Sequence, residues 1–344
     1  MRVYIKKIKD VSFITVKNNS GMKIILSTFG ASFYDLIVPD KNNHLESVLL
    51  TPTKVEDFYY ASGYYGKSIG RFAGRIDKGV CHINGNKHEL DINWNGVNSL
   101  HGGYDCIGYK NFDYKVVKEQ NYVDVIFTYL EKENKLPGDV EYTFTYRIMK
   151  DKNDIISNFE ATTTKDTHVN LTNHVYFNLS GECKRDCLDH KLQLLCDKYT
   201  RLNNELITLS IDPVNKVMDF RNMHAIKDYI YDESLQNHTA LGYDHCFIKE
   251  NVNDSKIAVL QDEQSGRRLT IHTSYPAVVY YAGCYPGGYD FNKNGMKIRK
   301  YHSTCLECQF IPNNINMDSN ETSILRKGEK YSQYIIYSFD LIEN

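Results

Sequence analysis

Alternation of apolar and polar residues constrains the fold of this 344-residue chain more than any other sequence feature. Residues 142–148, YTFTYRI, place two tyrosines, a phenylalanine and an isoleucine on one face, and similar runs occupy residues 124–130, 155–161 and 333–339. Side chains of a strand point to opposite faces in turn, so these runs predict strands that bury one face. The 27 Tyr and 15 Phe, with only 7 Pro, favour β-structure too.

Helical periodicity is hard to find in this sequence. Short helical turns are expected near residues 52–58 and 228–235, but no long amphipathic stripe stands out. Turn signals such as Asn84-Gly85-Asn86 separate the alternating runs. The pattern predicts an all-β fold, a large antiparallel β-sandwich that forms a single domain over residues 1–344.

Charge and cysteine content narrow the function classes. A formal net charge of -2, with acidic and basic residues spread along the chain, gives no basic stripe of the kind that nucleic acid requires. The sequence contains no uninterrupted stretch of ~18 apolar residues, which is the length that would predict a membrane span. The N-terminal MRVYIKKIKD alternates like a first strand and not like a signal peptide, so we expect a cytoplasmic protein. The nine scattered cysteines are expected to be reduced.

The segment Leu171–Gly181, LTNHVYFNLSG, is the first candidate site. As one extended strand it would place a polar set on one face (Thr172, His174, Tyr176 and Asn178) and a mostly apolar set on the other (Asn173, Val175, Phe177 and Leu179). A strand of this kind can anchor itself in a core and hold a histidine over a polar cleft. A purely structural histidine, whose hydrogen bonds are made within the protein, would give the same pattern.

The segment Cys305–Pro312, CLECQFIP, follows the same logic. Glu307 would lie opposite an apolar strand face, where a glutamate is expected only if it faces a polar cleft. Cys305 and Cys308 match a minimal metal or redox spacing, but an offset of three in a strand points the two sulfurs to opposite faces. We therefore expect no metal at this pair.

Three further segments carry candidate residues. IGRFAGRID holds Arg71 and Arg75, which would share a face if the segment were extended and could bind hydroxyls, carboxylates or phosphates. NSLHGG places His101 at a strand end before two glycines. LGYDHCF places Asp244 between aromatic residues, where an acid is usually paired or functional.

Taken in order, IGRFAGRID, NSLHGG, LTNHVYFNLSG, GYDHCF and LECQFIP resemble the aldose 1-epimerase (galactose mutarotase) family. The resemblance implies a galactose mutarotase-like supersandwich whose concave face binds a monosaccharide, without cofactor or metal. In this resemblance Glu307 matches the general base and His174 the general acid. The positions that bind sugar are expected to be Arg75, His101, Tyr176 and Asp244.

The chemistry suits these residue types. Interconverting anomers needs a proton removed from the C1 hydroxyl, here by Glu307, and a proton delivered to the ring oxygen, here by His174. Rotation about the C1–C2 bond of the opened sugar exposes the other carbonyl face, and the same groups then act in reverse. An imidazole pKa near ~6.5 is usable for such proton transfer.

The chain departs from the family pattern at several positions. Gly74 stands where an asparagine precedes the arginine, and Val279 stands where a glutamine is common. Phe112 replaces a usual tryptophan, and Asn313 replaces an aspartate after the proline. Losing two amides would remove hydrogen bonds worth roughly 0.5 to 1.5 kcal/mol each and could change which hydroxyls are recognised.

Several readings therefore stay open at this point. The leading hypothesis is an aldose 1-epimerase that acts on a free hexose of the glucose or galactose type. A family member that prefers a disaccharide or modified sugar, and a non-catalytic carbohydrate-binding protein, are alternatives. A third is a glycosidase or lyase that uses Asp244 with Glu307 as a carboxylate pair. The sequence does not indicate the oligomeric state.

Overall fold

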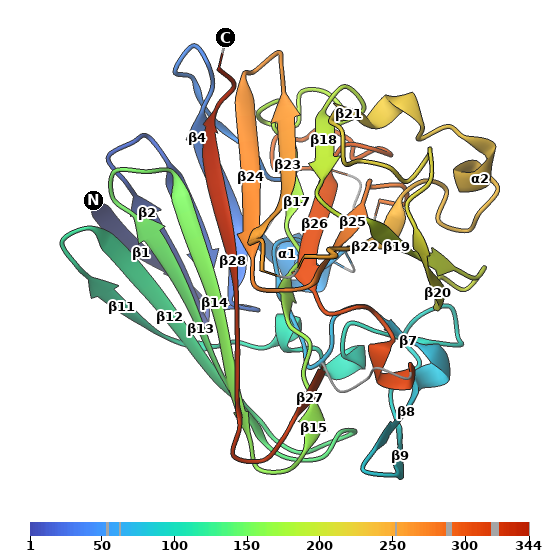
Figure 1. Cartoon of the computed structure of the whole chain (residues 1–344). Coiled ribbons are helices and arrows are strands. Elements are labelled where there is room, and N and C mark those ends of the chain that lie inside the picture. The colour runs from blue at the N-terminus through green and yellow to red at the C-terminus, as the bar shows by residue number, and fades with distance from the viewer. Residues whose placement is uncertain (53–54, 62, 252, 287–290, 318–322, 344) are drawn as a thin grey trace.

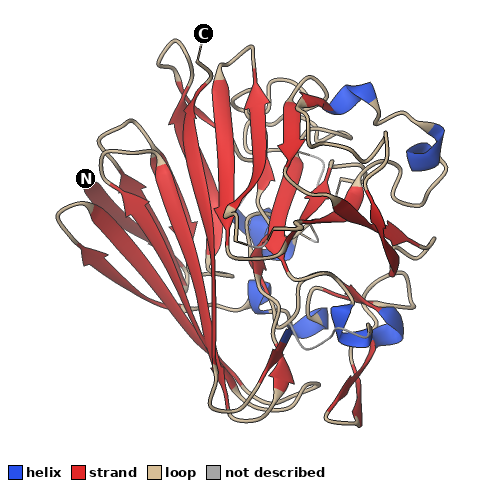
Figure 2. Ribbon diagram, in the orientation of Figure 1, coloured by secondary structure: helices blue, strands red, loops and turns tan. Residues whose placement is uncertain are grey.

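Strands make up most of the regular structure in this computed structural model, which describes residues 1–52, 55–61, 63–251, 253–286, 291–317 and 323–343 (Figure 1, Figure 2). Three large antiparallel sheets dominate, and the helices are short. The predicted all-β antiparallel sandwich is confirmed. Across the described residues, no helix is both long and apolar enough to span a membrane.

The five-stranded sheet follows sequence order, whereas the nine-stranded sheet joins strands from the first half of the chain to strands from the second. The five-stranded sheet consists of β1 (Arg2–Ile8), β2 (Val11–Lys17), β3 (Lys23–Ser27), β4 (Ser32–Pro39) and β5 (Leu45–Ser47). The nine-stranded sheet consists, in spatial order, of β11 (Asp113–Lys118), β12 (Tyr122–Glu131), β13 (Val140–Met149), β14 (Asp154–Thr163), β28 (Lys330–Leu341), β24 (Arg267–Thr273), β23 (Lys256–Asp262), β18 (Lys191–Leu194) and β21 (His224–Ala225).

The third sheet carries much of the site described below. Its six strands are, in spatial order, β17 (Tyr176–Phe177), β26 (Thr304–Gln309), β25 (Ala277–Tyr281), β22 (Asp244–Ile248), β19 (Lys198–Leu202) and β20 (Thr208–Pro213). Two-stranded pairs complete the β-structure: β6 (Ser68–Ile69) with β16 (Thr172–Asn173), β7 (Arg75–Ile76) with β10 (Ser99–Leu100), β8 (Val80–Ile83) with β9 (Asn86–Glu89), and β15 (Thr167–His168) with β27 (Ile324–Leu325).

Helical structure is limited to single turns or little more. The α-helices are α1 (Val55–Tyr60) and α2 (Glu233–Gln236). The 3₁₀ turns are η1 (Asp77–Gly79), η2 (Gly103–Asp105), η3 (Ile107–Tyr109), η4 (Ile226–Asp228) and η5 (Asn314–Asn316). The helical turn expected near residues 52–58 overlaps α1, although residues 53–54 lie outside the described part. The turn expected near residues 228–235 overlaps η4 and α2.

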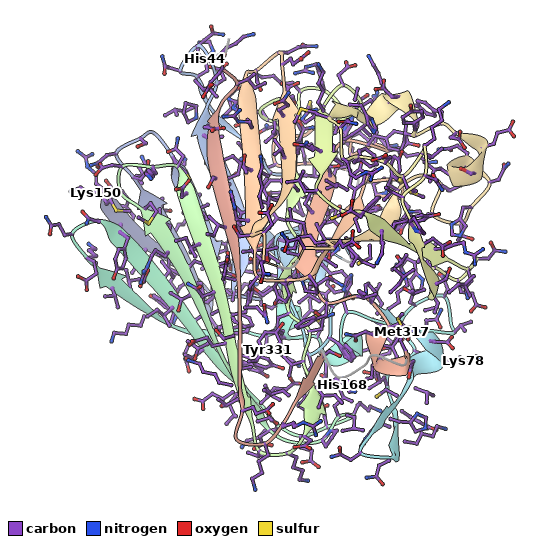
Figure 3. All side chains as sticks on the ribbon, viewed as in Figure 1. His44, Lys78, Lys150, His168, Met317 and Tyr331 are labelled. Atoms are coloured by element: carbon purple, nitrogen blue, oxygen red, sulfur yellow. The ribbon has the colours of Figure 1, made fainter. Side chains whose placement is uncertain are left out.

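Aromatic contacts between sheets define the two layers of the sandwich. The Phe33 ring of β4 lies 5.1 Å from Tyr146 of β13 and 5.6 Å from Tyr337 of β28, measured between ring centroids. The Phe177 ring of β17 lies 5.8 Å from the same Tyr337. The five-stranded and six-stranded sheets therefore cover one face of the nine-stranded sheet, and a bridge between Leu49 and Phe177 joins them. Side chains fill the space between the ribbons (Figure 3).

The alternating runs predicted the strands of the nine-stranded sheet well. The four runs lie in β12, β13, β14 and β28, which are neighbours in that order. Burial along β13 alternates with every residue from Tyr142 to Ile148. Asn84 and Gly85 form the predicted turn, because Ile83 pairs directly with Asn86 between β8 and β9. One hydrophobic cluster takes buried residues from all three large sheets, which supports the single-domain expectation; that expectation stays a prediction.

The segment Leu171–Gly181 is not the continuous strand that was predicted. It forms two short strands, β16 and β17, separated by His174 and Val175, because the segment exchanges one partner for another. β16 pairs with β6, whereas β17 pairs with β26. The His174 N–H donates to the Lys67 carbonyl at 2.8 Å, so the backbone stays hydrogen-bonded through the break. Val175, Phe177 and Leu179 belong to the main hydrophobic core, and the polar side chains between them are buried as well.

We expect Phe144→Ala to lower the free energy of unfolding by about 3 to 5 kcal/mol, because it removes a buried ring and leaves a cavity. Phe144 is fully buried, and its ring lies 5.2 Å from Phe159 and 5.6 Å from Phe112. The control is Thr145→Ala, at the next and partly exposed position of β13, which should cost less than about 1 kcal/mol. Urea titration followed by tryptophan fluorescence and circular dichroism gives both values. Equal losses in the two variants would contradict the burial assigned to β13.

Candidate active site

A cavity of about 680 Å³ lies over the six-stranded sheet, and every predicted site residue lines it. The sheet contributes residues from β17, β19, β20, β22, β25 and β26, and many of the other lining residues lie between positions 59 and 109. The predicted residues that meet here are Arg75, His101, His174, Tyr176, Asp244 and Glu307. They come from positions up to 232 residues apart in sequence (307 minus 75). Their assembly in one cavity makes a functional role for the set credible, and their individual roles stay predictions.

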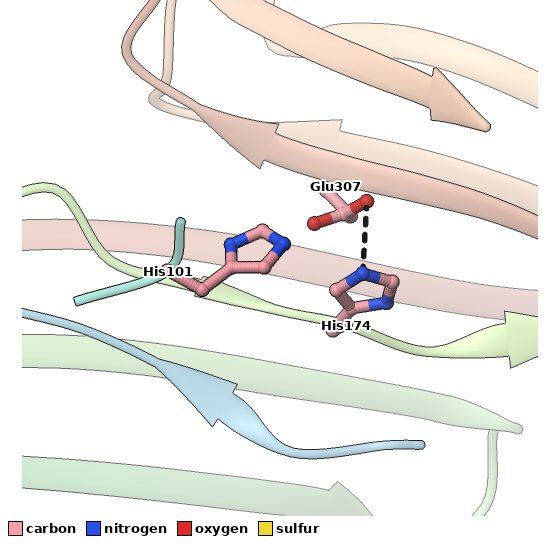
Figure 4. Close-up of side chains that lie close together, drawn as sticks. All are labelled: His101, His174 and Glu307. Atoms are coloured by element: carbon pink, nitrogen blue, oxygen red, sulfur yellow. Dashed lines mark ion pairs between the residues drawn. The ribbon is translucent and has the colours of Figure 1, made fainter. Parts of the chain in front are cut away.

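His174 and Glu307 form the centre of the site. The His174 Nε2 atom lies 3.6 Å from the Glu307 Oε1 atom, and Figure 4 shows the two side chains facing each other. Both side chains are more than nine-tenths buried. Glu307 lies in the middle of β26, where it pairs with Val279 of β25. Strand alternation therefore directs its carboxyl group into the cavity.

Burial shifts the two pKa values of this pair in opposite directions. Loss of hydration lowers the pKa of His174 to about 3, although the nearby negative charge of Asp244 favours the imidazolium. Loss of hydration also raises the pKa of Glu307 well above 4.5, and Asp244 adds to this shift by charge repulsion. The order of the two pKa values favours one proton on Glu307 beside a neutral His174. Such a pair can both accept and donate a proton.

Two tyrosine rings hold the His174 imidazole in place. The Tyr176 ring stacks on it at 4.8 Å between centroids, with an interplanar angle of 16°. Tyr64 stacks at 6.0 Å with an angle of 17°. Tyr176 belongs to the predicted set and meets His174 on the same side of the segment, as alternation requires. The stacking restricts rotation of the imidazole, so that its Nε2 atom stays directed at Glu307.

His101 has a defined tautomer because of one main-chain hydrogen bond. It follows β10 directly, as predicted, and its Nδ1 atom accepts a hydrogen bond from the Gly74 N–H at 3.1 Å. The proton of the neutral ring is therefore on Nε2, which can donate to a ligand in the cavity. Burial, aided by the positive charge of Arg75, holds the pKa of His101 well below 6.5. His101 is thus a neutral hydrogen-bond donor.

Arg75 and Asp244 form a buried ion pair at the other side of the cavity. The Arg75 Nη2 atom donates to Asp244 Oδ2 at 2.9 Å, and the Tyr285 hydroxyl donates to the same carboxylate oxygen. Burial alone would raise the pKa of Asp244, but Arg75 and the Tyr285 hydrogen bond hold it below its usual value. The guanidinium also lies 4.7 Å from the centre of the Trp94 ring. Asp244 is therefore a fixed carboxylate.

Of the two arginines in this segment, Arg75 lines the cavity and Arg71 does not, and the sugar-binding role of Arg75 stays a prediction. Arg71 and Arg75 do not share a strand face, because Gly74 adopts a φ of +84° and the strand comprises only Arg75 and Ile76. Arg71 points away from the cavity and donates to Glu131 at 3.1 Å and to the Pro137 carbonyl at 3.0 Å. Arg71 therefore has a structural role, and it does not line the cavity.

The remaining departures from the family pattern fall in different places. Gly74 and Val279 line the cavity. Phe112 lies in the core against Phe144 and Tyr129. Asn313 accepts a hydrogen bond from the Asp77 N–H at 3.0 Å, which supports the loop behind the site. Of the four changes, only the two amide losses therefore alter the cavity wall.

The described residues contain one group that could hold a metal ion, formed by His101, His174 and Glu307, whose ligand atoms lie within 4.8 Å of one another. Two histidines and one carboxylate are a composition seen at zinc sites. However, a ligating imidazole normally donates its other N–H to a neighbouring acceptor. His101 instead accepts at Nδ1, which leaves the proton on the nitrogen that would have to bind the metal. The donor set therefore fits proton transfer better than metal binding.

Sequence reasoning missed several aromatic residues that line the cavity, among them Tyr64, Trp94 and Tyr285. Trp94 is the only tryptophan in the chain, and this rarity was a usable signal. The other two are among 27 tyrosines and carry no distinguishing pattern. Tyr285 reaches Asp244 from 41 residues away, a contact that no local motif encodes.

Comparisons with known proteins agree with this geometry. The family described as Aldose 1-epimerase matches residues 12–338. Galactose mutarotase of Mus musculus is 30% identical over 323 residues, which cover 93% of this chain and 92% of the mouse protein. Aldose 1-epimerase of Escherichia coli (strain K12) is 31% identical over 337 residues, which cover 95% and 94%.

Solved structures extend the comparison to the fold. A structure described as the GalM/aldose epimerase homologue from C. elegans superposes with a TM-score of 0.85 at 28% identity, covering 97% of this chain and all of that one. Galactose 1-epimerase from Lactobacillus acidophilus NCFM gives a TM-score of 0.83 at 24% identity, with 99% of each chain covered, and shows the shared fold. The cavity and these matches lead to one conclusion: the chain belongs to the aldose 1-epimerase family.

Proposed function

We propose that this enzyme interconverts the α and β anomers of free aldohexoses of the galactose and glucose type, with Glu307 and His174 as the acid/base pair. The observation that carries the proposal is the 3.6 Å approach of His174 Nε2 to Glu307 Oε1 inside a cavity of sugar-binding character. Relatives named galactose mutarotase and aldose 1-epimerase support the reaction and the class of sugar.

Substrate contacts would place the shared proton where ring opening needs it. A C1 hydroxyl that donates to Glu307 favours the carboxylate, and a ring oxygen that accepts from His174 favours the imidazolium. Glu307 then removes the C1 proton while His174 protonates the ring oxygen, which breaks the C1–O5 bond. After rotation about C1–C2, the imidazole takes back the proton as the ring oxygen attacks the other face of the carbonyl, and Glu307 returns its proton to O1. The pair ends with the same single proton.

The surrounding residues would orient the sugar. The Asp244 carboxylate can accept hydrogen bonds from hydroxyls, and Arg75 holds it in place. The Nε atom of Arg75 is buried without a hydrogen-bond partner among the described residues, which leaves a donor for a hydroxyl. His101 would donate from Nε2, and Tyr176 would cover the apolar face of the pyranose next to His174.

Several alternatives receive less support. The comparisons do not favour a disaccharide specialist or a non-catalytic binding protein. A glycosidase would need Asp244 as a free nucleophile or base, whereas Arg75 and Tyr285 already donate to it. A phosphorylated sugar would need free cationic side chains, and Arg71 is not available in the cavity. We also propose a cytoplasmic location, which the nine buried thiols support.

We expect Glu307→Gln and His174→Ala each to reduce kcat/KM for mutarotation about 10²- to 10⁴-fold, because each variant loses one positioned proton transfer. Polarimetry of freshly dissolved α-D-galactose and α-D-glucose, corrected for the spontaneous rate, measures this. Glu307→Gln should melt no lower than wild type near pH 7. The raised pKa of Glu307 means that its ionisation costs stability as the pH rises above 4.5, and glutamine removes this cost. Wild-type protein that leaves both rotation rates at the spontaneous value would refute the proposal.

The pH dependence of kcat/KM gives an independent check. Its acid limb reports the second protonation of the His174–Glu307 pair, and its alkaline limb reports loss of the shared proton. Because the pKa of His174 is lowered to about 3 and that of Glu307 is raised, activity should persist well below pH 6.5. Asp244→Asn should move both limbs to lower pH, since the charge of Asp244 raises both pKa values. An acid limb at about 6.5 in the wild type, as for an exposed histidine, would speak against the buried pair.

A further inference from the structure

Gln309 is a cavity residue whose amide has almost no role within the protein. It lies two residues after Glu307 on β26, so both side chains point into the cavity, and it is fully buried. Its Oε1 atom has no hydrogen-bond partner within the part of the chain that the structure describes. Its Nε2 atom makes one contact, a 3.3 Å hydrogen bond to the carbonyl of the next residue, Phe310. Buried amides are normally satisfied, so an unpaired one calls for an explanation.

The single hydrogen bond of Gln309 is dispensable. The Phe310 carbonyl already accepts from Asn170 Nδ2 at 3.0 Å, and the Phe310 N–H donates to Asn170 Oδ1 at 2.9 Å. Asn170 therefore satisfies both main-chain groups of Phe310 without Gln309. Exchange of the two amide atoms of Gln309 would leave an unpaired donor in place of an unpaired acceptor. In either orientation one polar group remains available to a ligand.

Gly74 provides the space into which the Gln309 amide extends. A Cβ atom at Gly74 would lie 3.3 Å from Gln309 Nε2 and 2.7 Å from Pro312 Cβ, so any side chain there would press on both residues. The other amide that lines the cavity is Asn93, which is fully used because it donates to the Leu100 carbonyl and accepts from the Leu100 N–H. Among the described lining residues, Gln309 is thus the amide side chain that still has a polar atom free to bind a ligand.

We infer that Gln309 binds a ring hydroxyl of the sugar and helps to determine which hydroxyl pattern the enzyme accepts. Residues rise by about 3.3 Å each along a strand, so Gln309 lies about 7 Å along β26 from Glu307. A pyranose with its C1 hydroxyl at Glu307 reaches that distance with its far hydroxyls. An amide can donate to one hydroxyl and accept from another, which suits vicinal hydroxyl groups. The inference rests on the proposed function for the identity of the sugar.

The test uses Gln309→Met, which keeps the length of the side chain and removes the amide. The matched control is Thr208→Val, since Thr208 also lines the cavity but its hydroxyl already donates to the Pro312 carbonyl at 3.2 Å. For D-galactose we expect Gln309→Met to raise KM and the calorimetric Kd about three- to tenfold, with kcat within about twofold of wild type. The control should change neither constant by more than about twofold.

Deoxy sugars then identify the hydroxyl. We expect the loss caused by Gln309→Met to disappear for the monodeoxy galactose, among the 2-, 3-, 4- and 6-deoxy compounds, that lacks the group bound by the amide. A loss of equal size for every deoxy sugar would mean that Gln309 only supports the fold, and it would overturn the inference. Unchanged KM and Kd for D-galactose in the variant would overturn it as well.

Calorimetry separates this inference from the proposed reaction. Wild-type protein that binds D-galactose without accelerating mutarotation would refute the reaction, while a three- to tenfold weaker Kd in Gln309→Met would still support the role of the amide. Wild-type protein that accelerates mutarotation, with no change in the variant, would refute the inference alone. Absence of both binding and acceleration would refute both.

Discussion

The site depends on a strand that is paired along both edges. β26 hydrogen-bonds to β25 on one side, where Glu307 faces Val279, and to β17 on the other, where Cys305 faces Tyr176. Two fixed registers prevent β26 from sliding, and a slip of one residue would send Glu307 to the opposite face of the sheet. The same pairing brings the segment that carries His174 alongside β26. The strand order therefore brings together His174 and Glu307, the proposed acid/base pair, and the sandwich supplies the burial that separates their pKa values.

Patterns of period two carried most of the predictive information in the sequence. They located β12, β13, β14 and β28, because antiparallel strands with one buried face must alternate. The same rule put His174 opposite a buried apolar set and Glu307 opposite Leu306 and Cys308. Assigning roles to these two residues needed the family resemblance, since alternation identifies a face and says nothing about what that face binds.

Strand pairings and contacts between distant parts of the chain could not be predicted from local sequence patterns. The break at His174 arises because β16 and β17 pair with strands from distant parts of the chain, and no local pattern encodes such an exchange. Arg71 and Arg75 look equivalent in sequence, but the positive φ of Gly74 turns the chain between them and sends Arg71 to Glu131. The tyrosines that line the cavity, unlike the single tryptophan Trp94, cannot be distinguished in sequence from the many others in the chain.

The hydrogen bond from Gly74 to His101 has a consequence for how this enzyme can evolve. The donor is a main-chain N–H, so the tautomer of His101 is set by backbone position and is indifferent to the side chain at residue 74. Proline alone lacks this N–H, but the φ of +84° at Gly74 favours glycine or asparagine, and a Cβ there would require Gln309 and Pro312 to move. Variation at this one position can therefore change the shape of the cavity wall and leave the tautomer of His101 intact. Mutations at neighbouring positions of the cavity can therefore change substrate preference and proton transfer separately.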